Sequence, residues 1–237
     1  MQKPEEYSAN NMLPVRKIGR SHRSLRAVHP SAKTGQLVHL ESALERDFCC
    51  LLEFEPDIVS YVEQPVTIGY HLEGRTRRYT PDFLIFYAAE KPAVLAEIKY
   101  RADLHKNWAQ LKPKFRAAQH YAADNGWEFR LYTELEIQTP YLQNAKLLLR
   151  FKDPFLPVLP EYRQLLMATV AHLDTTTPAE IVRVAFGDAE HRAKLLPVLW
   201  HLISRGLIGC DLFQPLTMQS KIWSTEPSPN PFSHEQD

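Results

Sequence analysis

Several features that define special classes of protein are scarce in this sequence of 237 residues. Only three cysteines occur, two of them adjacent, which excludes a disulfide framework and predicts reduced thiols. No Cys/His cluster has the spacing of a zinc site, so we expect no structural zinc. No apolar run approaches the roughly 20 residues of a membrane span, and the N-terminus lacks the apolar stretch of a signal peptide. We therefore expect a cytoplasmic protein with no membrane partner.

Net charge is also lacking, because 28 basic residues balance 28 acidic ones. The charges are grouped along the chain, however. Residues 1–40 hold seven Lys or Arg against two acids, residues 41–73 hold eight acids against one base, and residues 99–116 hold six bases against one acid. An acidic block between two basic ones is expected for a cation site flanked by phosphate-binding surfaces. It is equally typical of an ordinary solvated surface.

Hydrophobic periodicity predicts an α-β-β-β-α-β-α order, which describes one compact α/β domain. Helices are expected at 40–54, 104–124 and 141–151, and strands at 58–72, 76–87, 93–100 and 127–133.

The pattern changes after a proline-rich segment. Three helices and a small hairpin follow, an order typical of a winged helix. We predict a basic arm at 1–38, the α/β domain at 39–152, a linker at 153–160, the winged-helix-like domain at 161–223 and a disordered tail at 224–237.

The strongest chemical pattern lies on two neighbouring strands of the α/β domain. Asp82 stands in or at the end of one strand, and Glu97 and Lys99 lie two residues apart on the next, so they share one face. Glu97 and Lys99 interrupt an apolar strand, where buried charges without partners are costly. Two converging carboxylates suit Mg²⁺, and a lysine beside them can orient a water or stabilise a transition state. A turn aspartate and a solvated strand face are the alternative explanation.

A third acid is expected on the first helix, where Glu45 and Glu41 lie one turn apart and cannot be separated by pattern alone. An exposed helix carboxylate is the alternative for both. Gln64 is a weaker candidate, and a sheet-edge amide is its simpler interpretation.

Basic residues beside this site predict contacts with DNA phosphates. The helix that follows Lys99 alternates bases with aromatic residues, and we expect its Trp108 in the core. The predicted phosphate contacts are Arg16, Lys17, Arg20 and Arg23 in the arm and Lys106, Lys112 and Lys114 on the helix.

Asp82 with Glu97-Ile98-Lys99 matches the PD-(D/E)xK signature of many restriction enzymes and resolvases. The surrounding runs SALERDFCCLLEFEPDIVSYVEQPVTIGY, RRYTPDFLIFY, EIKYRADLHKNWAQLKPKF and YAADNGWEFRLYTE resemble the TnsA family over roughly residues 30–150. The resemblance implies a restriction-endonuclease-like mixed sheet flanked by helices, with Glu45, Asp82, Glu97 and Lys99 at the catalytic positions. The first three of these would be the ligands of Mg²⁺, with Mn²⁺ as a substitute.

The same resemblance implies a place in a heteromeric transposase. This subunit would cleave the 5′ strand at the double-stranded ends of the transposon. A TnsB-like DDE transposase would act on the 3′ ends, and a TnsC-like AAA+ ATPase would regulate both. We expect the complex to associate with the bacterial nucleoid.

Two other functions fit parts of the sequence. A stand-alone restriction- or resolvase-type nuclease would cleave without partners. A non-catalytic assembly subunit would carry a decayed site, against which the intact Asp82, Glu97 and Lys99 argue. The C-terminal domain, with six bases and six acids over residues 158–223, favours contact with protein over contact with DNA.

Overall fold

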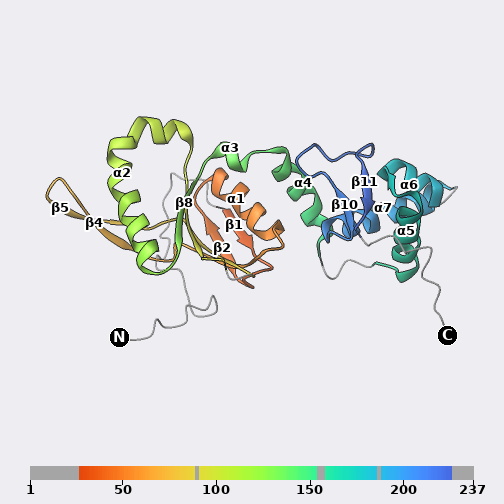
Figure 1. Cartoon of the computed structure of the whole chain (residues 1–237), viewed down its shortest axis with the longest axis horizontal. Coiled ribbons are helices and arrows are strands. Elements are labelled where there is room, and N and C mark those ends of the chain that lie inside the picture. The colour runs from red at the N-terminus through yellow and green to blue at the C-terminus, as the bar shows by residue number, and fades with distance from the viewer. Residues whose placement is uncertain (1–26, 89–90, 154–157, 186–187, 226–237) are drawn as a thin grey trace, which may run out of the picture. The chain divides into compact units, whose positions relative to one another are not determined.

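A computed structural model describes residues 27–88, 91–153, 158–185 and 188–225 of the chain (Figure 1). The chain forms two compact units, Met1–Gln138 and Thr139–Asp237. Among the described residues, none of the helices is both long and apolar enough to cross a membrane.

The first unit is built on a mixed four-stranded sheet in the order β3-β6-β7-β8. The first three strands pair antiparallel and β7 pairs parallel with β8. A parallel pair needs a long crossover, which α2 supplies between β7 and β8. The elements are β3 (Ile58–Glu63), β6 (Phe83–Tyr87), β7 (Val94–Ile98), α2 (Arg101–Asp124) and β8 (Glu128–Tyr132).

Helix α1 (Ala43–Phe54) packs against β2 (Leu37–Leu40), β3 and β7, and begins where the Ser42 side chain accepts a hydrogen bond from the Glu45 backbone N–H. Helix α2 contacts β7, β8 and the separate hairpin of β4 (Ile68–Leu72) and β5 (Arg75–Tyr79). Strand β7 is buried along its whole length, which explains its apolar sequence. This mixed sheet flanked by helices fits the nuclease-like α/β fold expected for the first part of the chain.

Two strands that we expected to be continuous are each divided by a proline. The segment 58–72 breaks at Gln64-Pro65 and the segment 76–87 breaks at Thr80-Pro81. Proline has no N–H for a sheet hydrogen bond, so a central strand ends there. As a result, β4 and β5 leave the sheet as a two-stranded ribbon, and both breaks fall beside Asp82.

The predicted arm at 1–38 extends too far into the folded unit. Strand β1 (Ala27–Pro30) pairs antiparallel with β2, and Val38 is buried. The Glu53 carboxylate then fixes the connection between them, because it accepts hydrogen bonds from Ser31 Oγ at 2.5 Å and from the Ala32 N–H at 3.2 Å. The folded part therefore includes residue 27 onward. Residues 1–26, with Arg16, Lys17, Arg20 and Arg23, lie outside the described residues.

The second unit begins earlier than the predicted linker. Helix α4 (Pro140–Leu148) and the 3₁₀ turn η2 (Leu149–Phe151) belong to it, whereas α3 (Glu134–Ile137) belongs to the first unit. The Asn144 side chain donates to the carbonyls of Leu212 and Gln214, each at 2.8 Å. These bonds to the far end of the second unit explain why the boundary falls at Gln138 instead of residue 152.

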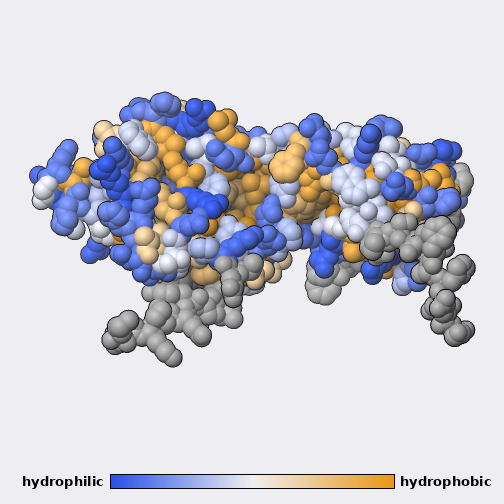
Figure 2. Space-filling model, in the orientation of Figure 1, coloured by the Kyte–Doolittle hydropathy of each residue, from blue (hydrophilic) through white to orange (hydrophobic). Residues whose placement is uncertain are grey.

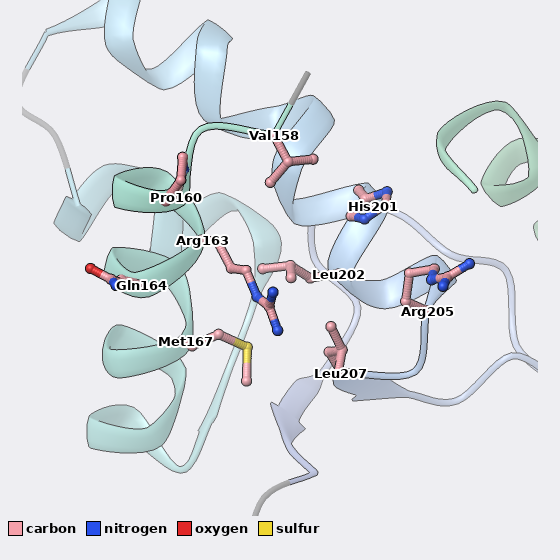
Figure 3. A pocket seen from close by; sticks show the side chains of 9 residues that line it. All are labelled: Val158, Pro160, Arg163, Gln164, Met167, His201, Leu202, Arg205 and Leu207. Atoms are coloured by element: carbon pink, nitrogen blue, oxygen red, sulfur yellow. The ribbon is translucent and has the colours of Figure 1, made fainter. Parts of the chain in front are cut away.

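The rest of the second unit contains the three helices and the short strands expected from the sequence. They are α5 (Pro160–Leu173), β9 (Thr175–Thr176), α6 (Pro178–Ala185), α7 (Ala189–Ser204), β10 (Ile208–Cys210) and β11 (Ile222–Ser224). The strands pair antiparallel in the order β10-β11-β9. A pocket of about 640 Å³ opens between α5 and the end of α7, with Met167 and Leu202 on its apolar side and Arg163 and Arg205 among its polar residues (Figure 3).

Candidate active site

Asp82 sits at the point where the chain enters β6, and the sheet holds it there. Its backbone N–H donates to the Ala96 carbonyl at 3.1 Å. Its carboxylate oxygen Oδ2 accepts a hydrogen bond from the Ile98 N–H at 2.7 Å. Since Ile98 stands between Glu97 and Lys99, this bond brings the Asp82 carboxylate to the two residues of the predicted motif.

Glu97 is 2% exposed, and both of its carboxylate oxygens have partners. Oε2 accepts a hydrogen bond from the Tyr79 hydroxyl at 2.7 Å, and Oε1 lies 2.9 Å from Lys114 Nζ. Lys99 Nζ is farther from the same oxygen, at 3.7 Å. The site therefore contains two lysines, of which the sequence motif contains only Lys99.

The charges of these groups act on one another. Burial raises the pKa of Asp82 well above 3.8, and the neighbouring carboxylates of Glu97 and Glu45 raise it further. Burial works to lower the pKa of Lys99, but the negative charges of Glu97, Asp82 and Glu45 outweigh it, so the pKa is raised overall. An excess of carboxylate over ammonium charge in a buried site is an environment that attracts a cation.

Glu45 is near this cluster, but its carboxylate accepts hydrogen bonds at the start of its own helix, α1. Its Oε2 accepts from the Glu41 N–H and its Oε1 from the Ser42 hydroxyl, both at 2.8 Å. Burial raises the pKa of Glu45. Asp82 and Lys99 both respond to its charge, which favours Glu45 over Glu41 as the helix acid.

Gln64 lies closer to the site than a sheet-edge amide would. It follows β3 with a positive φ of 46°, and its backbone N–H donates to the Asp82 carbonyl at 2.8 Å. Its side chain is buried, and Nε2 donates to Glu41 Oε1 at 3.3 Å. Within the described part of the chain, Gln64 Oε1 has no hydrogen-bond partner. A buried amide oxygen without a donor is costly.

The basic residues of α2 separate into two groups. Lys106 and Lys112 are exposed, as phosphate contacts would be. Lys114 instead points to Glu97, with its Nζ 4.4 Å from the centre of the Tyr79 ring. The expectation that Trp108 lies in the core was wrong, because Trp108 is 48% exposed, although its ring lies 6.2 Å from that of Phe115.

The donor set suits Mg²⁺ if water completes the coordination. Across the described ranges, no three His, Cys, Asp or Glu side chains are grouped so that they could hold a metal ion by themselves. The oxygens of Glu45, the predicted third ligand, accept hydrogen bonds at the start of α1. Mg²⁺ commonly takes only one or two protein carboxylates and keeps several waters. Asp82 and Glu97 would supply those two.

Comparison with known families connects this geometry to a chemistry. Residues 55–134 match the family described as TnsA-like endonuclease N terminal. The match supports membership of the TnsA family. The match covers about a third of the chain and includes Gln64, Asp82, Glu97, Lys99 and Lys114, whereas Glu45 lies before it. Among curated proteins, none matches the chain. The match to a TnsA-like endonuclease domain supports a nuclease, and Asp82 and Glu97 lie within the matched segment.

Some residues of this TnsA-like site were missed by the sequence analysis. Tyr79 stands in the run that carries the family resemblance, but its pairing with Glu97 depends on the break at Pro81. Lys114 was assigned to phosphate, since helical spacing cannot show which side chain turns toward a sheet. Three arginines on β5 were also missed, because the segment was taken as part of one long strand.

Proposed function

We propose that this protein is the metal-dependent DNA endonuclease subunit of a transposase, and that it hydrolyses the 5′ strand at the transposon ends. The observation that carries the proposal is the Asp82 carboxylate, held by the Ile98 N–H between Glu97 and Lys99. The match to the TnsA-like endonuclease family supports the class of reaction.

Each residue of the site has a chemical role in this proposal. Asp82 and Glu97 would hold Mg²⁺, or Mn²⁺ in its place, and the metal supplies an activated water and neutralises charge on the phosphate. Tyr79 and Lys114 fix the orientation of Glu97 through its two oxygens. Lys99 is the less tightly held lysine, so its Nζ is the group free to orient water or to stabilise the charge that develops on phosphate.

The proposal includes partner proteins. The family implies a TnsB-like DDE transposase that processes the 3′ ends and a TnsC-like AAA+ ATPase that regulates assembly. In the second unit, helices α5, α6 and α7 with three short strands support the winged-helix interpretation, and the balanced charge of residues 158–223 favours a role in protein contact. Base recognition at the ends would then come mainly from the TnsB-like partner.

A cleavage assay tests this function. The full-length protein is incubated with duplex DNA carrying transposon ends and with Mg²⁺, with and without the two partners. We expect little nicking by the protein alone and 5′-strand cleavage at the ends when both partners are present. Asp82→Asn should remove this cleavage. Efficient cleavage of arbitrary duplex DNA without partners would replace the proposal with a stand-alone restriction- or resolvase-type nuclease.

A further inference from the structure

The β4–β5 ribbon carries a group of arginines that no part of the catalytic site uses. Arg75, Arg77 and Arg78 occupy three of the five positions of β5 and are exposed. Within the described residues, none of the three guanidinium groups has an ion-pair or hydrogen-bond partner. Glu73 is the single acid in the hairpin and stands in the turn. In Figure 2 the surface over this hairpin, at the left end of the view, is mostly hydrophilic.

The ribbon is anchored where it meets the active site. Ile68 and Tyr79 pair across its base and belong to the buried cluster that α2 covers. The Tyr79 hydroxyl also donates to Glu97. A strand advances about 3.4 Å per residue, so Arg77 and Arg75 lie roughly 7 and 14 Å along the ribbon from Tyr79. The arginines therefore extend outward from the catalytic carboxylate over the length of a few base pairs.

The ribbon places positive charge on both of its faces. Arg75 and Arg77 are two residues apart and lie on one face of the ribbon, whereas Arg78 lies on the other face. Arg78 pairs across the ribbon with Gly69, which has no side chain. The turn at Glu73-Gly74 has positive φ at both residues, 51° and 72°, which suits the tight two-residue hairpin that keeps the ribbon narrow. A flat contact would need charge on one face only. Charge on both faces fits a groove with a phosphate wall on each side.

We propose that the β4–β5 ribbon enters the major groove of duplex DNA next to the scissile phosphate. The major groove is about 12 Å wide and admits a two-stranded ribbon, whereas the minor groove is about half as wide. Arg75, Arg77 and Arg78 contact the phosphates and guanine edges within a few base pairs of the cut. The ribbon thus orients the strand whose phosphate meets Asp82 and Glu97. This inference rests on the proposed nuclease function.

Binding measurements test the ribbon separately from the chemistry. Full-length protein with Asp82→Asn, which does not cut, is titrated against a fluorescent transposon-end duplex from low to moderate salt. Replacing all three arginines by alanine should weaken binding by about tenfold for each arginine that touches DNA. The slope of log affinity against log salt should fall by about 0.9 for each phosphate contact that is lost.

Arg130→Ala is the matched control, because Arg130 is exposed in the same unit but is paired with Glu128 at 2.6 Å. It should leave both the affinity and the salt slope unchanged. The thermal midpoint of the triple variant should also match that of the parent, since the arginines are exposed. An unchanged affinity and slope in the triple variant would overturn the role of the ribbon. Failure of the wild-type protein to bind and cut DNA under any partner condition would instead contradict the proposed function.

A cross-linking experiment decides the groove. Arg77→Cys, in protein with Cys50 and Cys210 changed to serine, is mixed with duplexes that carry a tether on adenine N6 in the major groove or on guanine N2 in the minor groove. Each tether ends in a mixed disulfide with a small thiol, which leaves when the cysteine thiolate attacks. We expect a disulfide with the N6 tether within about four base pairs of the cut and none with the N2 tether. Cross-linking to the minor-groove tether alone, or to neither tether, would overturn the groove assignment.

Discussion

Asp82 lies at the centre of the candidate active site, where burial and neighbouring carboxylates disfavour its ionised form. Its raised pKa means that the folded protein keeps a proton which the unfolded chain releases above about pH 4. The free energy of unfolding therefore falls as the pH rises from about 4 to the raised pKa of Asp82. Above that pKa the ionised carboxylate makes its full unfavourable contribution to stability. This is the cost of collecting carboxylates where a cation is needed.

Asp82→Asn should therefore stabilise the protein in the absence of metal. We expect a higher thermal midpoint than wild type at pH 7, with a gain of about 1 kcal/mol corresponding to about 4 °C. Its midpoint should also depend less on pH between 5 and 8, although the raised pKa of Glu45 leaves part of the slope. Thermal unfolding in EDTA across this range measures both effects. If the thermal midpoint of Asp82→Asn depends on pH as strongly as that of wild type, the pKa of Asp82 is not raised by its neighbouring carboxylates.

Lys114 should be essential for the integrity of the site even though it lies outside the motif. Lys114→Met removes an ammonium 2.9 Å from the buried Glu97, and removing one partner of a buried pair costs about 3 kcal/mol. Lys99 remains near the same oxygen and reduces that loss. Lys112→Met, on the exposed side of the same helix, should change stability by less than about 0.5 kcal/mol. Urea unfolding compares the two, and equal effects would contradict the assignment.

At the level of elements, α1 depends on the same carboxylate that the family resemblance places in catalysis. Glu45→Ala removes the acceptor for the Glu41 N–H and the Ser42 hydroxyl, and losing such a cap costs about 1 kcal/mol. Glu45→Gln keeps an acceptor oxygen but removes the charge. We expect Glu45→Gln to unfold like wild type and to cleave more slowly. If Glu45→Gln cleaves at the wild-type rate, Glu45 acts only as a cap.

The β1–β2 hairpin sets the limit for testing the basic arm. Removal of residues 1–26 should leave the first unit folded and should reduce the salt dependence of DNA binding, because positive charges that release counterions are lost. Removal of residues 1–35 should also destabilise the protein, since Ser31 and Ala32 donate to the buried Glu53. Circular dichroism melts of the two truncations distinguish these effects. Equal melting of both would show that the hairpin adds no stability.

At the scale of the whole molecule, the boundary at Gln138 changes how the two units should be separated. A chain ending at Gln138 should fold and retain the Asp82, Glu97 and Lys99 site. It should lose activation by the TnsB- and TnsC-like partners, because the second unit is proposed as the protein contact. A chain ending at residue 156 should aggregate more, since α4 would lose the loop carbonyls that Asn144 binds. Gel filtration and the cleavage assay compare them.

Local chemistry determined how much could be predicted from sequence. Periodicity predicted the main helices of the first unit, but it did not predict the β1–β2 hairpin or the division of two strands at prolines. The grouping of Glu97 with Lys99 followed from the two-residue repeat of a strand. The contacts of Glu97 with Tyr79 and Lys114 could not be predicted, because they depend on the proline breaks and on the packing of α2. Such contacts depend on tertiary structure, which no spacing within one element contains. The prediction of the domain boundary was wrong for the same reason, because Asn144 binds residues about 70 positions away.

The unpaired amide oxygen of Gln64 gives the protein a built-in spectroscopic reporter. The two side-chain amide protons of a glutamine give separate signals in a ¹⁵N-correlated NMR spectrum. The Gln64 side chain is buried, and its backbone N–H donates to the Asp82 carbonyl. A new donor at Oε1 would polarise the C–N bond and move both signals. Titration with Mg²⁺ could then be followed at a single side chain, with Gln138, which donates to Asp47 at 3.1 Å, as the internal reference.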